Sequence, residues 1–307
     1  MLLRWLLRLL LKLLLRRSSA LNLLRALLLV VSVVSFPTAC TSLGSKSSLI
    51  SARDQAVMKI ADCKLGQFLK SEKKTLHSSS RAVDADEIKI LNWNLFKGKK
   101  SDWKSDLVDF SKDADLILIQ EAIISDELFD SLHQSMSWDV THGFSNENVT
   151  TGVLTASNVA SVRRCGFRHK EPLIRTPKTA LVTEYPILDR EKNLLVGNIH
   201  AINFTWGLTE FRNQLVGVLS LLAEHDGPII LAGDFNTWRD KRVKILFELV
   251  DELGLSEVSL EEDHRTQAFG QSLDFIFYKG LVCNKAGVFQ VSSSDHNPIH
   301  AVFEYRE

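Results

Sequence analysis

Two short polar motifs in the C-terminal third carry side chains that could activate water. The first is Gly233-Asp234-Phe235-Asn236, which follows the apolar run Ile229-Ile230-Leu231, and the second is Asp295-His296. Residues two apart on a strand point to the same side, so Asp234 and Asn236 could face one pocket. A carboxylate can deprotonate water, an imidazole can act as general acid or base, and an amide can donate to a phosphate oxygen. The alternative for the first motif is an Asx turn before a helix.

Two further polar groups end apolar runs upstream. Asn94 follows Ile90-Leu91, and Glu121 follows the run 116–119. A carboxylate at the mouth of a buried strand is costly unless it is paired or holds a cation. Their alternatives are a turn amide and an exposed strand-end glutamate. The hypothesis that joins all four motifs is a single pocket at four strand ends, built for metal-assisted attack on a phosphate.

Two more residues extend this pocket. His200 ends the apolar run 194–199, and Asp274 could fix the tautomer of His296 as its carboxylate partner. A lone histidine is more often a satisfied surface or core residue, which is the alternative for both imidazoles. The sequence contains no Gly-x-Ser-x-Gly elbow, P-loop, dinucleotide fingerprint or His-Glu-x-x-His motif, so those enzyme classes are excluded.

The elements that must position these residues alternate along the chain from Glu87 onward. Period and flanking residues predict helices over 102–112, 126–134, 208–224 and 241–253. Strands are expected over 88–95, 116–120, 152–156, 179–185, 194–200, 228–231, 273–278, 281–291 and 299–305. A mixed order of this kind indicates two packed sheets with helices outside them, an α/β class.

Charge is distributed unevenly along the 307 residues, although the formal net charge is +0. After Arg53 there are 29 basic residues against 37 acidic ones, a net charge of about −8. Tight nonspecific binders of DNA normally carry a basic face, so an acidic body does not fit that class. The 45% hydrophobic content is ordinary for a globular protein.

Residues 1–40 are interpreted as a signal or membrane-anchor segment. Arg4, Arg8, Lys12 and Arg16 recur every four positions between leucines, and an apolar run from Ala26 to Phe36 precedes Cys40. This is similar to a bacterial lipoprotein signal, although Pro37 stands where such signals usually have an aliphatic residue. We expect a membrane-associated, extracytoplasmic protein. An uncleaved amphipathic anchor or a cytoplasmic product remains the alternative.

The segment 41–86 is expected to be a polar linker with one short helix within 54–69, and 87–307 to be the catalytic domain. If Cys40 is lipidated, Cys63, Cys165 and Cys283 allow at most one disulfide bridge. None of them lies at metal-ligand spacing from another, so a zinc site is not expected.

Taken in order, the polar motifs resemble those of the endonuclease/exonuclease/phosphatase superfamily. The segments that carry the resemblance are Asn92-Trp93-Asn94, Gln120-Glu121, His200, Gly233-Asp234-Phe235-Asn236, Leu273-Asp274-Phe275 and Ser294-Asp295-His296. Each is weak singly, but their order and intervals agree from about Ile88 to Phe303. Asn198-Ile199-His200-Ala201 and Ala268-Phe269-Gly270 look like the bacterial YafD-like branch. The resemblance implies the DNase I-like fold, a four-layer α/β sandwich of two mixed, mostly antiparallel sheets flanked by helices.

The resemblance also implies a role for each matched residue. Asn94 and Glu121 would hold a divalent cation with Asp295 close to it, and hard oxygen ligands favour Mg²⁺, with Mn²⁺ as a substitute. Asp234 would activate or orient the nucleophile. The remaining roles are phosphate support by Asn236 and His200 and the pairing of Asp274 with His296. Phe96 stands where some nuclease members carry an acidic residue, so a second metal contact is missing.

The function expected from the resemblance is metal-dependent hydrolysis of a phosphodiester, as in an endonuclease or exonuclease. The first alternative substrate is a phospholipid or small phosphate ester, and the second alternative is a non-catalytic envelope binding protein. The membrane is an expected partner through the N-terminal segment, and no protein partner is implied. Arg175 and Lys178 precede a strand and are weak candidates for a phosphate contact. A solvated basic loop is the preferred interpretation for Lys97, Arg163, Arg164, Arg168 and Lys170.

Overall fold

The chain folds around two β-sheets. The structure is a computed structural model that describes residues 48–51, 57–59, 69–70, 82–145, 149–173, 176–205 and 207–306. Within those ranges the larger sheet has eight strands in the order β16-β17-β4-β5-β7-β6-β1-β2. Their bounds are Leu281–Val288, Ile299–Tyr305, Ile88–Asn94, Leu116–Ile123, Thr150–Ser157, Ser137–Ser145, Ser48–Ser51 and Val57–Lys59.

The second sheet has seven described strands in the order β12-β15-β11-β10-β9-β8-β3. Their bounds are Ser256–Glu257, Asp274–Lys279, Ile229–Asp234, Leu194–His200, Pro177–Tyr185, Arg163–Lys170 and Leu69–Lys70. A short hairpin of β13 (Gln267–Ala268) and β14 (Gln271–Ser272) stands apart. Among the named strand pairs, β4–β5 and β10–β11 are parallel and the rest are antiparallel, which confirms the expected mixed, mostly antiparallel sheets.

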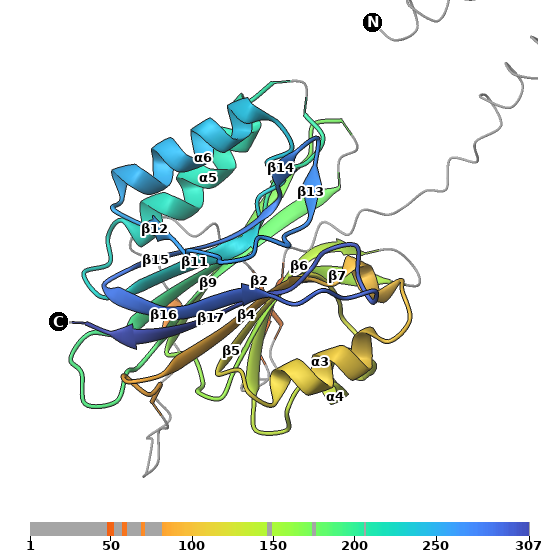
Figure 1. The fold of residues 1–307 in the computed structure, drawn as a ribbon. Coiled ribbons are helices and arrows are strands. Elements are labelled where there is room, and N and C mark those ends of the chain that lie inside the picture. Colours follow the sequence, from red (N-terminus) through yellow and green to blue (C-terminus); the bar gives the residue numbers. More distant parts are fainter. Residues whose placement is uncertain are drawn as a thin grey trace, which may run out of the picture. The chain divides into compact units, whose positions relative to one another are not determined.

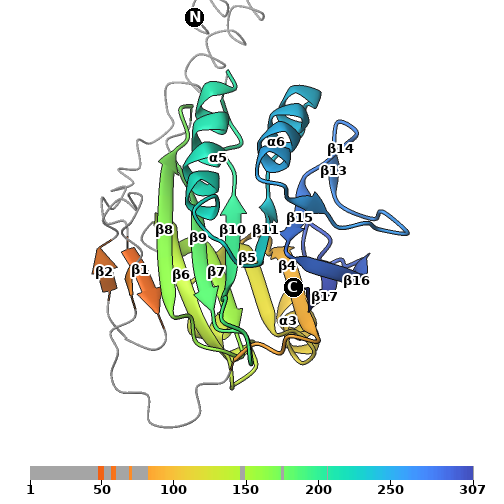
Figure 2. The same cartoon turned by 90° about the vertical axis from the view of Figure 1, so that its left-hand side faces the viewer.

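Helices cover the outer faces of the two sheets. Figure 1 shows α5 (Thr209–Leu222) and α6 (Asp240–Glu252) over the smaller sheet, and α3 (Trp103–Ser111) and α4 (Asp126–Asp130) beside the larger one. The view in Figure 2 shows α5 and α6 lying side by side. A short 3-10 helix, η1 (Phe96–Gly98), follows β4. Helix, sheet, sheet and helix form the four layers that the sequence predicts.

Apolar side chains of the central strands alternate between two cores. On β4, Ile90 packs between the sheets while Leu91 packs in the cluster that contains Trp103 of α3. On β11, Ile230 packs between the sheets and Leu231 packs in the cluster of α5 and α6. Both faces of these strands are therefore buried, which explains why their sequences are continuous apolar runs instead of alternating ones.

The expected helix within 54–69 is wrong where the structure describes that segment. Val57–Lys59 is strand β2, which pairs with β1, and Leu69 begins β3, which pairs with β8. Backbone pairing with a sheet edge overrides a weak helical periodicity, because the edge supplies partners for the N–H and C=O groups. The rest of 54–69, and the whole segment 1–40, lie outside the described residues.

Candidate active site

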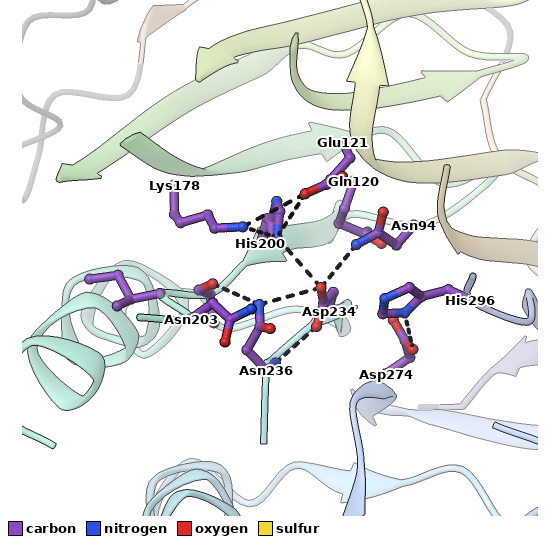
Figure 3. A network of polar contacts seen from close by, with 12 residues as sticks. Asn94, Gln120, Glu121, Lys178, His200, Asn203, Asp234, Asn236, Asp274 and His296 are labelled. Carbon is purple, nitrogen blue, oxygen red and sulfur yellow. Dashed lines mark hydrogen bonds and ion pairs between the residues drawn. The ribbon is translucent and has the colours of Figure 1, made fainter. Parts of the chain in front are cut away.

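Strands β4, β5, β10, β11 and β15 bring polar residues together at one edge of the sandwich. The parallel pair β4–β5 aligns Asn94 with Gln120, the residue before Glu121, and the parallel pair β10–β11 aligns His200 with Asp234. The antiparallel pair β11–β15 then sets Asp234 opposite Asp274. Parallel strands end at the same edge, so the register itself gathers these side chains. Figure 3 shows them pointing toward one another, with His296 beside Asp274.

Buried amides tie the two sheets together beneath this edge. The Gln120 side-chain amide donates to the side-chain oxygens of Asn92, at 2.8 Å, and Asn198, at 2.7 Å. Asn198 in turn donates to the carbonyl of Leu154 at 2.8 Å. Because β5 and β10 belong to different sheets, the Gln120–Asn198 bond fixes one sheet relative to the other near the site.

Asp234 is the hub of the site and is only 2% exposed. Its Oδ2 accepts a hydrogen bond from Asn94 Nδ2 at 2.9 Å and lies 3.5 Å from His200 Nε2. Its Oδ1 accepts from the backbone N–H of Asn236 at 2.9 Å. Burial, with the nearby charge of Asp274, raises the pKa of Asp234 to about 6. A carboxylate with that pKa is suited to act as a base near neutral pH.

The backbone on either side of Asp234 adopts unusual conformations. Gly233 has φ +151, and a Cβ there would lie 2.0 Å from the carbonyl oxygen of Ile199, so only glycine fits. Asn236 and Glu121 both have φ +50, which is uncommon for residues with a side chain. The Asn236 amide donates to the carbonyl of Ala201 at 2.9 Å and to Asp234 Oδ2 at 3.3 Å. Both of its amide protons are thus used to orient Asp234 and the β10 end.

His296 forms a buried pair with Asp274. Its Nδ1 donates to Asp274 Oδ2 at 2.7 Å, and its carbonyl accepts from Trp93 Nε1 at 3.0 Å. Burial alone would lower the pKa of His296, but the charges of Asp274 and Asp234 and the Asp274 hydrogen bond raise it to about 10. At neutral pH this imidazole therefore carries a proton and a positive charge.

His200 has the opposite protonation preference. Burial, with the positive charges of Lys178 and Lys97, holds its pKa well below the usual range. Lys178 Nζ lies 2.5 Å from His200 Nε2, and an ammonium can only donate, so Nε2 accepts and the ring proton sits on Nδ1. Gln214 of α5 donates to the His200 carbonyl at 3.1 Å. The site therefore pairs a neutral imidazole with a charged one, on opposite sides of Asp234.

Glu121 faces two lysines and His200 in the structure. Lys97 Nζ lies 3.0 Å from its Oε2, while Lys178 Nζ and His200 Nε2 lie 3.8 and 3.9 Å from its Oε1. Lys178 thereby joins the site as the sequence suggested, although through Glu121 and His200. Lys97, for which a solvated loop was the preferred interpretation, instead pairs with this carboxylate. Lys97 and its neighbour Phe96 both have positive φ, at 56 and 51, and no sequence pattern indicates these two conformations.

The oxygen atoms near Glu121 are chemically suited to a hydrated divalent cation. Glu121 is close enough to Asp295 for its charge to add to burial in raising the Asp295 pKa, and a cation would relieve that repulsion. The Asn94 amide oxygen accepts from the Phe96 N–H at 3.0 Å. Among the residues that the structure describes, no three His, Cys, Asp or Glu side chains cluster as a metal cage. Mg²⁺ keeps several waters and needs only one or two carboxylates, so this donor set fits it.

The sequence of this chain matches the profile of the Endonuclease/Exonuclease/phosphatase family over residues 91–296. The chain belongs to this family. A UPF0294 protein of Erwinia tasmaniensis is 41% identical over 224 residues, which cover 72% of this chain and 83% of the relative. Relatives of this kind confirm the resemblance to the YafD-like branch. Enzymes of the family generally use divalent metal ions.

Solved structures confirm the fold. An endonuclease/exonuclease/phosphatase from Bacteroides vulgatus superimposes with a TM-score of 0.55 at 16% identity, covering 72% of this chain and 99% of that one. The mannosyl-6-phosphatase Bt3783 of Bacteroides thetaiotaomicron gives 0.54 at 14% identity, covering 71% and 100%. These likenesses show the DNase I-like architecture that the sequence predicts.

Among the residues that the structure describes, the site residues predicted from the sequence lie together, with Asp295 at the exposed rim of the site. Arg175 lies outside the described residues. Arg163, Arg164, Arg168 and Lys170 form strand β8 instead of a loop. Arg164 is buried 3.6 Å from Asp139. The sequence missed β8 because its basic residues hide the strand periodicity.

Proposed function

We propose that this protein is a divalent-metal-dependent phosphodiesterase of the endonuclease/exonuclease type. The observation that carries the proposal is the buried Asp234 carboxylate between a neutral imidazole, His200, and a charged one, His296. A base, a fixed positive charge and a neutral imidazole around one point are the groups that hydrolysis of a phosphate ester requires.

Each side chain has a task in this proposal. Asp234 accepts the proton of the attacking water, since its pKa of about 6 leaves it ionised and basic near pH 7. His296, held by Asp274, offers its charged Nε2–H to the oxygens that gain negative charge. Lys178 and Lys97 add positive charge for the same phosphate. Asn94 and Asn236 hold Asp234 in position from two sides.

Glu121 and Asp295, with the Asn94 amide oxygen, are the residues that would hold Mg²⁺ or Mn²⁺. When bound, such an ion supplies Lewis-acid stabilisation of a phosphoryl oxygen and lowers the pKa of a bound water. The substitution Glu121→Gln, which removes the carboxylate charge, is therefore expected to weaken metal binding. Isothermal titration with Mn²⁺ measures this without any assay of turnover.

A second candidate is hydrolysis of a phospholipid or another small phosphate ester. The net charge of about −8 after Arg53 favours it over a duplex nucleic acid, which is itself an anion. The mannosyl-6-phosphatase of Bacteroides thetaiotaomicron carries the same fold, so the architecture accepts small substrates in at least that protein. The third candidate, a binding protein without turnover, predicts ligand binding but no hydrolysis.

A substrate panel separates these candidates. Wild-type protein with Mg²⁺ or Mn²⁺ is tested on bis-p-nitrophenyl phosphate, plasmid DNA, short single strands and a phospholipid. Hydrolysis of DNA or oligonucleotides that disappears in Asp234→Asn supports the nuclease proposal. Hydrolysis confined to the lipid favours the second candidate, and binding without product formation favours the third.

For location, we propose that the mature chain is extracytoplasmic and attached to a membrane through a lipidated Cys40. The signal-like pattern of residues 1–40 supports this. The described part of the chain has no helix long and apolar enough to cross a membrane. Mass spectrometry of the mature N-terminus tests the proposal, and an intact Met1 in the purified protein contradicts it.

A further inference from the structure

A pocket of about 470 Å³ opens directly beside the catalytic residues. Its lining includes Lys97, Glu121, Lys178 and His200, which are charged and polar groups of the active site. It also includes Phe144, Asn203 and Phe204. The pocket therefore combines cationic groups suited to a phosphate with aromatic residues that the reaction itself does not require.

Asn203 and Phe204 belong to the segment 201–205, whose peptide groups are held by buried side chains. Glu171 is fully buried, and its Oε1 accepts from the N–H groups of Asn203, at 2.7 Å, and Phe204, at 3.2 Å. Its Oε2 accepts from the hydroxyl of Thr176 at 2.9 Å, so Glu171 also links the segment to the turn after β8. A carboxylate that accepts several hydrogen bonds holds the backbone firmly.

Arg242 of α6 holds the same segment from the other side. Its guanidinium donates to the carbonyls of Ile202, at 2.6 Å, and Asn203, at 2.7 Å, and to the carbonyl of Asn236 at 2.9 Å. The side chain is fully buried and stacks on Phe211 and Trp238. Arg242 thus connects the segment 201–205 to a residue that orients Asp234.

Phe204 is the aromatic residue of the segment that Glu171 and Arg242 hold. Its side chain is 49% exposed although its own N–H is fixed by Glu171. An exposed ring contributes little to folding through burial. Packing of this ring therefore does not explain why two buried charged residues, Glu171 and Arg242, hold the backbone around it. Fixing the backbone that carries an aromatic ring before the ligand arrives lowers the entropy lost on binding.

We propose that Phe204 is a stacking platform for an aromatic ring of the substrate, such as a nucleobase, whose phosphate lies near Lys97 and Lys178 in the same pocket. The inference rests on the proposed phosphodiesterase function and deepens it by naming a nucleotide-like substrate. The pocket suits an aromatic ring better than an acyl chain, because a ring can stack on Phe204 while its polar edge reaches Asn203. Phe204 is a specificity residue and takes no part in proton transfer.

The test compares two diesters that differ in whether they carry a ring. Wild type, Phe204→Ala, Phe204→Trp and the control Phe269→Ala are assayed on thymidylyl-thymidine and on glycerophosphocholine, with products separated by chromatography. Phe269 is also an exposed aromatic, at 89%, but lies on the β13–β14 hairpin outside the pocket. We expect Phe204→Ala to lower kcat/KM for thymidylyl-thymidine about tenfold. The kcat/KM for glycerophosphocholine should not change in Phe204→Ala. Phe204→Trp, which keeps an aromatic ring, should cleave thymidylyl-thymidine at about the wild-type rate.

Equal losses on both diesters, no loss on either, or a larger loss on glycerophosphocholine would overturn the proposal. A second readout avoids turnover: equilibrium dialysis of thymidine 5′-monophosphate with Asp234→Asn, alone and combined with Phe204→Ala. Weaker nucleotide binding in the double variant supports the platform, and unchanged binding contradicts it. Absence of hydrolysis by the wild type, by contrast, contradicts only the proposed function.

Discussion

Asp234 and Asp274 face each other at paired positions of β11 and β15, and His296 binds Asp274 at 2.7 Å. The two carboxylates consequently differ in environment. Asp274 shares a hydrogen bond with a charged imidazole, whereas the Asp274 charge contributes to raising the pKa of Asp234. One carboxylate of this pair is therefore a fixed partner and the other is a base, although both are aspartates on neighbouring strands.

The acid limb of the pH–rate profile should report Asp234. Because its pKa is raised to about 6, kcat/KM should fall as pH decreases through that region and Asp234 becomes protonated. The measurement is kcat/KM for bis-p-nitrophenyl phosphate between about pH 4 and 11 at saturating metal. A rate that stays constant down to pH 4.5 would show that Asp234 is not the base.

Asp234→Asn should abolish hydrolysis and yet stabilise the fold at pH 7. A carboxyl whose folded pKa is raised above its unfolded value loses stability as pH rises between the two values, here from about 4 to 6. The neutral asparagine recovers part of the stability lost when Asp234 ionises, roughly 1–3 kcal/mol in the free energy of unfolding at neutral pH. Urea unfolding at pH 7 and at pH 4 checks the sign, since the difference between variant and wild type should shrink at the lower pH.

The Asp274 partner should set the basic limb of the same profile. Without the Asp274 charge and hydrogen bond, burial is opposed only by the charges of Asp234 and Asp295, so the pKa of His296 falls from about 10. In the wild type this pair stabilises the fold fully below the ordinary histidine pKa of 6.5, and that stabilisation is lost as pH rises from there through about 10. Asp274→Asn is thus expected to lower kcat and to move the basic limb toward neutral pH. An unshifted limb would show that Asp274 acts only structurally.

Gly233→Ala should unfold or strongly destabilise the protein. The added Cβ would meet the carbonyl oxygen of Ile199 at 2.0 Å in a pair of central strands, where the backbone has no room to yield. We expect a loss of about 3 kcal/mol or more in the free energy of unfolding. Gly217→Ala on α5 is the matched control, because its Cβ meets nothing nearer than 3.9 Å and a helical alanine is favoured.

Gln120→Ala should weaken the contact between the two sheets. It removes hydrogen bonds to Asn92 and Asn198 and leaves their buried side-chain oxygens without those donors. We expect roughly 2–4 kcal/mol of destabilisation from lost bonds and a cavity. Thermal unfolding by circular dichroism measures it, and a change of melting temperature below 2 °C would contradict this role.

The end of a strand such as Leu194–His200 was predictable because its apolar run ends at a polar residue. The predicted bounds of Ile299–Tyr305 also match the structure. Strand β8 was not, since Arg163 to Lys170 carries five basic or imidazole side chains. The pairing of Lys97 with Glu121 depends on positive φ at Phe96 and Lys97, which no local pattern announces. Glu171 and Arg242, which both bond the backbone of Asn203, are likewise 71 positions apart in the sequence.

The most direct test of the central claim is hydrolysis of a phosphodiester by purified wild-type protein with Mg²⁺ or Mn²⁺, compared with Asp234→Asn and His296→Ala. The account predicts metal-dependent product formation that EDTA stops, and a loss of at least about a hundredfold in each folded variant. Equal rates in wild type and both variants, or no product from DNA, oligonucleotide, lipid and bis-p-nitrophenyl phosphate, would contradict it.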